Sequence, residues 1–365
     1  MADDKKKISL SFAALSPYIE QPIISPREEK YPGREFIQWG DRNAYPDYLE
    51  DLCENVASLQ SIIDGSADYV CGEQVNVSRT LQGQYMNRKK QTADDLVRDL
   101  AISFFTYGGF AVQVIRSQSG DIAELYAMDM KNLRCDKDNE VFYYSETWNR
   151  RFSMVKTLVY PKFIPDARSV PSSVLFVKNT AYHTYPRPKY AACLKACEIE
   201  RSIDEYHLNS INNGFMGSVL VNFNNGAPTD EEQEEVEKGI NEKFAGKNNA
   251  GRIIIAYNDT KENATTIESI DVPDYGDRYD SLAKRSRQQI FTAFRANPNL
   301  FGIPTENLGF SQEEYDAAFR LYNRTQIMPV QKLICRSIGK IFGDQNYMTI
   351  EPFTLAQNGR SSTDI

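Results

Sequence analysis

The sequence has little of the chemistry on which most enzymes depend. It contains two histidines and two tryptophans among 365 residues. The short motifs G-x-S-x-G, H-E-x-x-H and G-x-G-x-x-G, which mark common catalytic and cofactor sites, do not occur in it. Carboxylates are frequent, as in any acidic chain, but none lies in a context that predicts a shifted pKa. We therefore predict that the protein is not an enzyme and uses no cofactor and no metal.

Long apolar runs and a disulfide framework are missing as well. No apolar run approaches the length that spans a bilayer, and the first residues, MADDKKKISLSF, hold too short an apolar stretch for a signal peptide. Apart from Cys193 and Cys197, the six cysteines are widely scattered, which fits a reducing compartment. These absences predict a soluble protein that is made in the cytosol and has no membrane partner.

Positive charge is in deficit, because 50 acidic residues face 42 lysines and arginines and give a net charge of -8. Tight binding in a DNA groove requires a clustered basic surface, so this class of DNA-binding protein is disfavoured. A protein that lets DNA pass without gripping it stays possible. The 21 tyrosines and 19 phenylalanines suit large protein–protein contact surfaces.

Three local patterns resemble binding sites but have simpler interpretations. His183, His207, Cys193 and Cys197 form the one group with any likeness to a metal site, but structural zinc sites usually use closer cysteine pairs on turns. Core-facing thiols are the alternative that the spacing favours. The segment AGKNNAG lacks the leading glycine and the Ser/Thr of a phosphate-binding loop. CDKDNE has calcium-loop spacing, but Val141 replaces the required glycine, so we predict a hairpin turn.

The first half of the chain predicts an α+β fold. Helices are expected from Pro46, from Ala57 to Val70, and from an N-cap at Thr92 to Gly108. The period then changes to two, and the strands up to about Asn179 are expected to form an antiparallel meander. Residues 1–30 are interpreted as an extended arm.

The second half alternates long helices with a small insert. A long helix begins near Tyr190, and a strand, a short helix opened by Thr229-x-x-Glu232 and two further strands follow. A second long helix precedes the segment ANPNLFGIPTENLGF. A third begins at Ser311, and Pro329 is expected to kink it.

The basic residues Lys284, Arg285 and Arg287 on the second long helix stand out in an acidic chain. They have two interpretations. They pair with Glu198, Asp204 and Glu205, within one subunit or between neighbours, or they face a phosphate backbone. The first is favoured, because exposed charge runs are usually solvated or paired.

The order of these parts resembles the portal (head–tail connector) proteins of tailed bacteriophages over most of the chain. Five passages carry the likeness, in this order: WGDRNAYPDYLEDL followed by IIDGSADYVCGEQV, then YPRPKYAACLKACEIERSIDEYHLNSINNGFMGSVLV, KFAGKNNAGRIIIAY, DRYDSLAKRSRQQIFTAFRANPNLFGIP and FSQEEYDAAFRLYNRTQIMPVQKLI. The family usually carries a helical crown after the last helix, and little of the chain remains beyond Phe342. The resemblance therefore implies nothing about a crown in this chain.

The resemblance implies a division of the chain into named parts. They are an arm at 1–30, a wing at 31–189, a stem helix at 190–215, a clip at 216–273, a second stem helix at 274–296, a tunnel loop at 297–311, a long kinked helix at 312–343 and a short tail or reduced crown at 344–365.

The resemblance also implies a function. Copies would form a ring, usually of twelve, at a capsid vertex, through which double-stranded DNA enters and leaves the virion. Implied partners are the terminase large subunit, neck or adaptor proteins, and capsid and scaffolding proteins, with assembly in the host cytoplasm. The clip residues expected to dock terminase are Glu234, Glu237, Lys238, Lys243 and Lys247. The tunnel-loop residues expected to face DNA are Asn297, Asn299, Leu300, Phe301, Thr305 and Asn307.

Within the loop, Leu300, Phe301 and Ile303 are expected to pack, while Pro298 and Pro304 restrict the backbone and Gly302 and Gly309 allow unusual turns. The alternative is an ordinary connection between two helices. For the whole protein, the alternatives are another ring-forming neck or adaptor protein, or an uncharacterised hydrolase that uses carboxylates.

Overall fold

The structure, a computed structural model, describes residues 10–13, 23–30, 35–148, 157–212, 219–223, 229, 253–257, 275–303 and 312–353. By internal contacts the chain divides into two compact units. The larger comprises Ile23–Glu198 and Ser286–Ile365, and the smaller comprises Met1–Pro22 and Ile199–Arg285. The two long helices α4 (Leu194–Asn212) and α6 (Tyr275–Phe294) each have residues in both units.

Three helices near the start of the larger unit begin and end where local sequence predicts. They are α1 (Tyr45–Asn55), α2 (Ala57–Cys71) and α3 (Ala93–Tyr107). Pro46 lies in the first turn of α1, and Gly72 ends α2 with a φ of 66°. Thr92 caps α3, because its Oγ1 accepts from the Asp95 amide at 3.2 Å while Asp95 Oδ2 accepts from the Thr92 amide at 2.8 Å.

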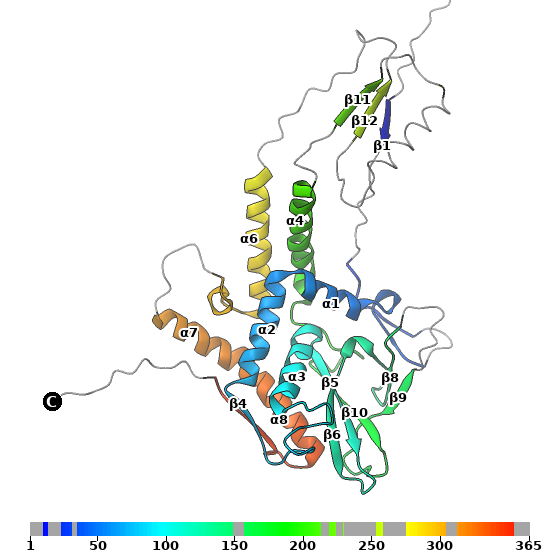
Figure 1. Cartoon of the computed structure of the whole chain (residues 1–365), viewed down its shortest axis with the longest axis vertical. Helices are drawn as coiled ribbons and strands as arrows, with labels where there is room; N and C mark the ends of the chain where they lie inside the picture. The colour runs from blue at the N-terminus through cyan, green and yellow to red at the C-terminus, as the bar shows by residue number, and fades with distance from the viewer. Residues whose placement is uncertain are drawn as a thin grey trace, which may run out of the picture. The chain divides into compact units, whose positions relative to one another are not determined.

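Two antiparallel sheets of three strands follow these helices (Figure 1). The first has the order β10-β5-β6, with β5 (Gly109–Arg116), β6 (Ile122–Met128) and β10 (Ser172–Lys178). The second has the order β7-β8-β9, with β7 (Leu133–Cys135), β8 (Val141–Tyr144) and β9 (Leu158–Pro161). Between β7 and β8, Asp136 Oδ1 accepts from the amides of Glu140 at 2.8 Å and Val141 at 3.1 Å, which confirms the predicted hairpin turn.

The expected meander is wrong in two pairings, because β6 does not pair with β7 and β10 does not pair with β9. β10 does not continue the second sheet as an antiparallel neighbour of β9 but returns to pair with β5, with Leu175 opposite Val112. The physical reason is burial: Phe110, Ala111, Val112 and Val114 are all fully buried, so β5 needs a neighbour on each side. Alternation along a strand predicts that it is a strand but not which strand it pairs with.

The third long helix is interrupted as predicted. It consists of α7 (Gln312–Tyr322), a π-helical turn η6 (Asn323–Ile327) and α8 (Met328–Phe342). Beyond it, β13 (Met348–Glu351) pairs with β4 (Gln74–Val77), so part of the stretch assigned to a tail belongs to a two-stranded sheet of the larger unit.

In the smaller unit, three short strands form a mixed sheet of the order β1-β12-β11. β11 (Val219–Phe223) is parallel to β12 (Ile253–Tyr257), and β1 (Leu10–Ala13) pairs with β12 in the antiparallel sense. The arm is therefore extended where it is described, but its pairing with a strand far along the chain was not predicted. The predicted short helix after Thr229, the strand TTIESIDV, and Gly214 lie outside the described residues.

The core of the larger unit joins helices and sheets, and it includes a buried cation. Arg134 is fully buried and donates to the carbonyls of Asn43 at 3.0 Å, Lys131 at 2.7 Å and Leu133 at 2.8 Å. Its guanidinium also lies 5.1 Å from the centre of the Trp148 ring. These carbonyl contacts compensate the charge, and they hold the segment between β6 and β7 against the start of α1.

None of the helices within the described part of the chain is long and apolar enough to cross a bilayer.

Candidate functional site

Local backbone angles and hydrogen bonds determine the conformation of the segment after α6. Arg295 has a φ of 53°, and the Ala296 amide donates to Phe291 O at 2.9 Å, which ends the helix. Asn297 Oδ1 then accepts from the Asn299 amide at 3.1 Å and caps a single 3-10 turn, η5 (Pro298–Phe301). Gly302 closes this turn with a φ of 76°, as its predicted freedom to make unusual turns requires.

Two hydroxyl groups of α2 hold the backbone of this turn. Tyr69 Oη donates to Leu300 O at 2.9 Å, and Ser61 Oγ donates to Phe301 O at 3.4 Å. Leu300 is 7% exposed and belongs to the hydrophobic core, while Ile303 is half-buried against the same core. The loop therefore leaves α6 from a fixed root on α2.

Phe301 is held by aromatic rings from three helices. Its ring centre lies 6.0 Å from that of Phe291 on α6, 6.1 Å from Tyr69 on α2 and 5.6 Å from Tyr322 on α7. Against this ring α2 presents Gly65, where an added Cβ would lie 2.9 Å from Phe301 Cδ1. The prediction that Leu300, Phe301 and Ile303 pack is confirmed.

The structure describes four of the six loop residues that were expected to face DNA. The burial of Leu300 leaves that side chain little surface for DNA, whereas Phe301 is half-buried. Asn297 and Asn299 are also half-buried. Thr305 and Asn307 lie outside the described residues.

The distortion expected at Pro329 lies immediately before that residue. The Met328 amide donates to Asn323 O, five residues back, which defines the π turn. Pro329 has no amide hydrogen to continue the α-helical ladder. Before the turn, the Tyr322 and Ser66 hydroxyls share a buried hydrogen bond of 2.7 Å. The π turn thus connects two helices whose positions are both fixed by the core.

The basic residues Lys284, Arg285 and Arg287 are all exposed on α6. Of the carboxylates considered as their partners, Glu205 forms an ion pair with Arg201 at 3.0 Å. The clip residues expected to dock terminase, Glu234, Glu237, Lys238, Lys243 and Lys247, lie outside the described residues.

The histidines and cysteines serve separate local contacts. Cys197 is fully buried in the core, and Cys193 Sγ donates to Gln289 O at 3.4 Å. The His207 ring lies 5.9 Å from the Tyr279 ring, and the His183 carbonyl accepts from Lys178. Among the described residues, no group of three or more His, Cys, Asp or Glu side chains could hold a metal ion.

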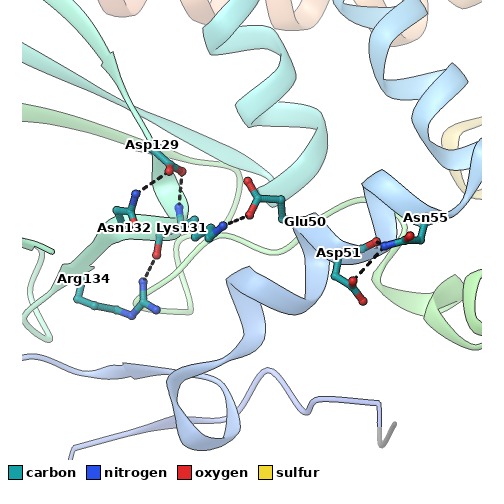
Figure 2. Close-up of polar contacts among 7 residues, drawn as sticks. All are labelled: Glu50, Asp51, Asn55, Asp129, Lys131, Asn132 and Arg134. Atoms are coloured by element: carbon teal, nitrogen blue, oxygen red, sulfur yellow. Dashed lines mark hydrogen bonds and ion pairs between the residues drawn. The ribbon is translucent and has the colours of Figure 1, made fainter. Parts of the chain in front are cut away.

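A second feature, which was not predicted, is an acidic cavity of about 350 Å³ between α1, α3 and β6. Figure 2 shows the polar contacts at one side of it. Glu50 on α1 forms an ion pair with Lys131, and Asp129 Oδ1 accepts from the Lys131 amide at 2.9 Å. The lining residues are Glu50, Cys53, Asp99, Ile102, Ser103, Thr106, Tyr107, Ala127, Met128, Asp129 and Met130.

The cavity disfavours negative charge. Partial burial raises the pKa of Asp99 and of Asp129, although both residues keep contact with solvent. Burial, followed by the charges of Glu50 and Asp129, raises the pKa of Tyr107. The hydrogen bond from Lys131 to Glu50 raises the pKa of that lysine. The cavity would therefore favour a cation. The acids come from three elements that are far apart in sequence, so no spacing could have indicated them.

Comparison with known proteins identifies the protein family of this chain. The phage portal protein family matches residues 76–356, which is well over half of the chain. The chain therefore belongs to the phage portal protein family, and the resemblance inferred from sequence is confirmed. Proteins of this family are structural components and not enzymes.

Solved structures agree on the fold. A chain from the virion of a native gene transfer agent (GTA) particle has a TM-score of 0.52 and 14% identity, over 90% of this chain and 86% of that one. A chain from the neck of an empty GTA particle, computed with C6 symmetry, has a TM-score of 0.52 and 13% identity, over 92% and 88%. The α+β portal fold expected from sequence is thereby confirmed.

The relatives found by sequence match a smaller share of the chain than the solved structures do. An uncharacterized protein of Rickettsia felis (strain ATCC VR-1525 / URRWXCal2) is 27% identical over 177 residues, which are 47% of this chain and 43% of that protein. An uncharacterized protein of Rickettsia bellii (strain RML369-C) is 26% identical over 188 residues, which are 50% and 46%. The chain thus spans less than half the length of each of these relatives.

Proposed function

We propose that copies of this chain close into a ring at the vertex of a phage-like particle and that DNA passes through the ring during packaging and ejection. Membership of the portal family is the observation that carries the proposal. The similarity in fold to a neck protein of a particle with C6 symmetry supports it, because a ring of twelve copies also obeys sixfold symmetry.

The anchored segment after α6 is the part that we assign to the channel. In a ring, a loop between two helices is repeated around the axis and becomes a collar. Contacts of Tyr69 with Leu300 and Phe301 fix the root of this loop. The polar side chains Asn299, Thr305 and Asn307 would touch passing DNA.

Weak contact is what passage of DNA requires. Each firm contact with a phosphate adds salt-dependent affinity and would hold the duplex in place. The loop residues 297–311 include no lysine or arginine, and the chain as a whole carries a net charge of -8. Lys284, Arg285 and Arg287 are then better suited to a contact between subunits.

The remaining assignments belong to the same proposal. The arm, wing, stem, clip and tunnel loop keep the boundaries expected from sequence, while the stretch assigned to the tail contributes β13 to a sheet with β4. The clip would dock the terminase large subunit through Glu234, Glu237, Lys238, Lys243 and Lys247, and later the neck proteins. Capsid and scaffolding proteins would surround the wing, with assembly in the host cytoplasm and final residence in the virion.

A second candidate is another ring-forming protein of the neck, which never meets the packaging motor. The similarity to a chain in a particle neck favours it specifically. Binding of terminase separates the two, because a portal protein binds the packaging motor and a neck protein does not.

Particle imaging of the purified chain tests the ring directly. We expect closed rings of about a dozen copies whose bore admits duplex DNA. A persistent monomer under conditions that favour assembly, or a bore too narrow for a double strand, would contradict the proposal.

Replacement of residues 304–309 by a Gly/Ser linker of equal length tests the loop. We expect rings to persist and DNA packaging or retention to fall, because the anchored root from Asn297 to Ile303 is left unchanged. The matched control is a replacement of the same length in the polar C-terminal stretch AQNGRS, which should leave packaging at the wild-type level. Unchanged packaging by the loop variant would refute the role given to the loop.

A further inference from the structure

A stripe of positive charge follows one face of α8. Lys332, Arg336 and Lys340 recur every four residues, and all three side chains are exposed. Within the described part of the chain, none of them has an ion pair. Like charges four residues apart destabilise a helix. The C-terminal end of the helix dipole stabilises the charge of Lys340, but Lys332 and Arg336 lie too far from that end.

The acidic cavity between α1, α3 and β6 has the opposite character. It joins the carboxylates of Glu50, Asp99 and Asp129 in a hollow of about 350 Å³, at the lower end of the range for ligand pockets. Glu50 is already paired with Lys131, whereas Asp99 accepts from the neutral side-chain amide of Gln91 at 3.0 Å and has no ion pair with any residue that the structure describes. Room for one more cation is left.

Tyr107 is an independent feature of the cavity that could receive a group. The residue is 6% exposed and lines the cavity, and its hydroxyl makes no hydrogen bond with any residue that the structure describes. The hydroxyl oxygen keeps contact with solvent, so it is open to a group that enters the cavity. It could accept from an ammonium or guanidinium group and donate to a carboxylate at the same time.

We propose that the cavity receives a basic side chain from the α8 stripe of a second copy of the chain. This inference rests on the proposed ring. A closed ring of identical copies needs two different, complementary patches on each subunit. None of the cavity-lining residues lies on α8, so one copy can offer its cavity to one neighbour and its stripe to the other. A metal ion is a poor occupant, because the described residues include no suitable group of ligands.

Assembly of the full-length chain tests the proposal, with the fraction in rings measured against protein concentration by mass photometry. Tyr107→Phe removes the hydroxyl, Asp99→Asn removes one charge, and the triple variant Lys332→Gln/Arg336→Gln/Lys340→Gln removes the stripe. We expect each to need about tenfold more protein for half-assembly, because one charged contact per interface is lost. Asp99→Asn should add little to the triple variant, because both remove the same contact.

Matched controls separate this contact from general damage. Tyr45→Phe removes a tyrosine hydroxyl that lies outside the cavity and has no hydrogen-bond partner in the described part of the chain. Lys90→Gln/Lys137→Gln/Arg168→Gln removes three exposed cations elsewhere on the same unit. Both controls should assemble like the wild type. The thermal midpoint of monomeric Asp99→Asn should not fall, because its amide oxygen still accepts from Gln91.

The outcomes separate a failure of the proposed ring from a failure of the proposed contact between the α8 stripe and the cavity. If the wild type forms no rings, the proposed function fails. If it forms rings and the Tyr107 and stripe variants assemble normally, this inference fails and the ring stands. Loss of DNA retention by the stripe variant with normal assembly would assign the stripe to DNA and overturn the inference. Binding of spermidine that depends on Asp99, with normal assembly, would assign the cavity to a small cation and overturn it as well.

Discussion

Gly65 on α2 faces the ring of Phe301 in the loop root. Gly65 lies in the interior of α2, where glycine is less favourable than alanine by about 0.5–1 kcal/mol. A Cβ at this position would lie 2.9 Å from the Phe301 ring, which Phe291, Tyr69 and Tyr322 hold from other sides. Glycine is therefore required by the loop and not by the helix.

The effect of Gly65→Ala on the free energy of unfolding should change sign when Phe301 is also replaced. In the wild type we expect it to lower the free energy of unfolding by about 1 kcal/mol, because Phe301 must move. In a Phe301→Ala background it should raise the free energy of unfolding by about 0.5–1 kcal/mol, because only the helix preference remains. Urea denaturation measures both values.

A Phe353→Ala background is the matched control, because Phe353 belongs to the same aromatic cluster through Tyr69 and Phe319 but makes no contact with Gly65. Gly65→Ala should remain destabilising there. The same sign in all three backgrounds would show that Gly65 does not set the position of the loop.

At the scale of elements, the π turn η6 decides how the last long helix fits the core. A π turn is an α-helix with one inserted residue, so its removal restores a continuous helix with both flanks in their original register. Tyr322 before the turn and Val330 and Ile334 after it are all buried, so both flanks are fixed. Pro329 is compatible with the turn because no amide is required from it there.

Deletion of the exposed Thr325 should produce a continuous helix that Pro329 then disrupts. We expect the deletion to lower the free energy of unfolding by about 3 kcal/mol, the usual cost of proline inside a helix. Combining the deletion with Pro329→Ala should recover most of that loss. Denaturant titration with far-ultraviolet circular dichroism measures both variants.

Pro329→Ala alone is the control and should change stability by less than about 1 kcal/mol, because the contacts on both flanks hold the turn in place. If the deletion with Pro329→Ala is no more stable than the deletion alone, the inserted residue has a role other than accommodating proline.

For the whole molecule, the smaller unit is built from segments that lie far apart in the chain. Its sheet takes β1 from the first residues and β11 and β12 from the insert, with Phe12 opposite Ile254. β12 is the central strand, so β1 covers an edge that would otherwise present unpaired amide and carbonyl groups.

Removal of residues 1–22 should expose that edge without affecting the larger unit. We expect hydrogen exchange at the amides of Ile253–Tyr257 to accelerate by about tenfold or more, because half of the ladder around β12 is lost. Exchange in α3 of the same molecules provides the internal control and should not change. Equal protection of β12 with and without the arm would contradict the pairing.

Local rules were sufficient for most helices and for the class of protein. Pro46, Gly72 and Thr92 mark helix ends through caps and backbone angles that depend on a few neighbouring residues, and these positions were predicted correctly. The apolar residues of the loop and the interruption near Pro329 were also predicted. The order of such elements was enough to indicate the portal family.

The contacts between residues that are distant in sequence became known from the tertiary structure alone. The return of β10 to β5, the pairing of β1 with β12, the contact of Gly65 with Phe301 and the acidic cavity all join residues that are distant in sequence. Periodicity reports which face of an element is buried, because burial acts on each residue separately. It does not report the partner, because the choice among many apolar or charged faces depends on how all of them pack together.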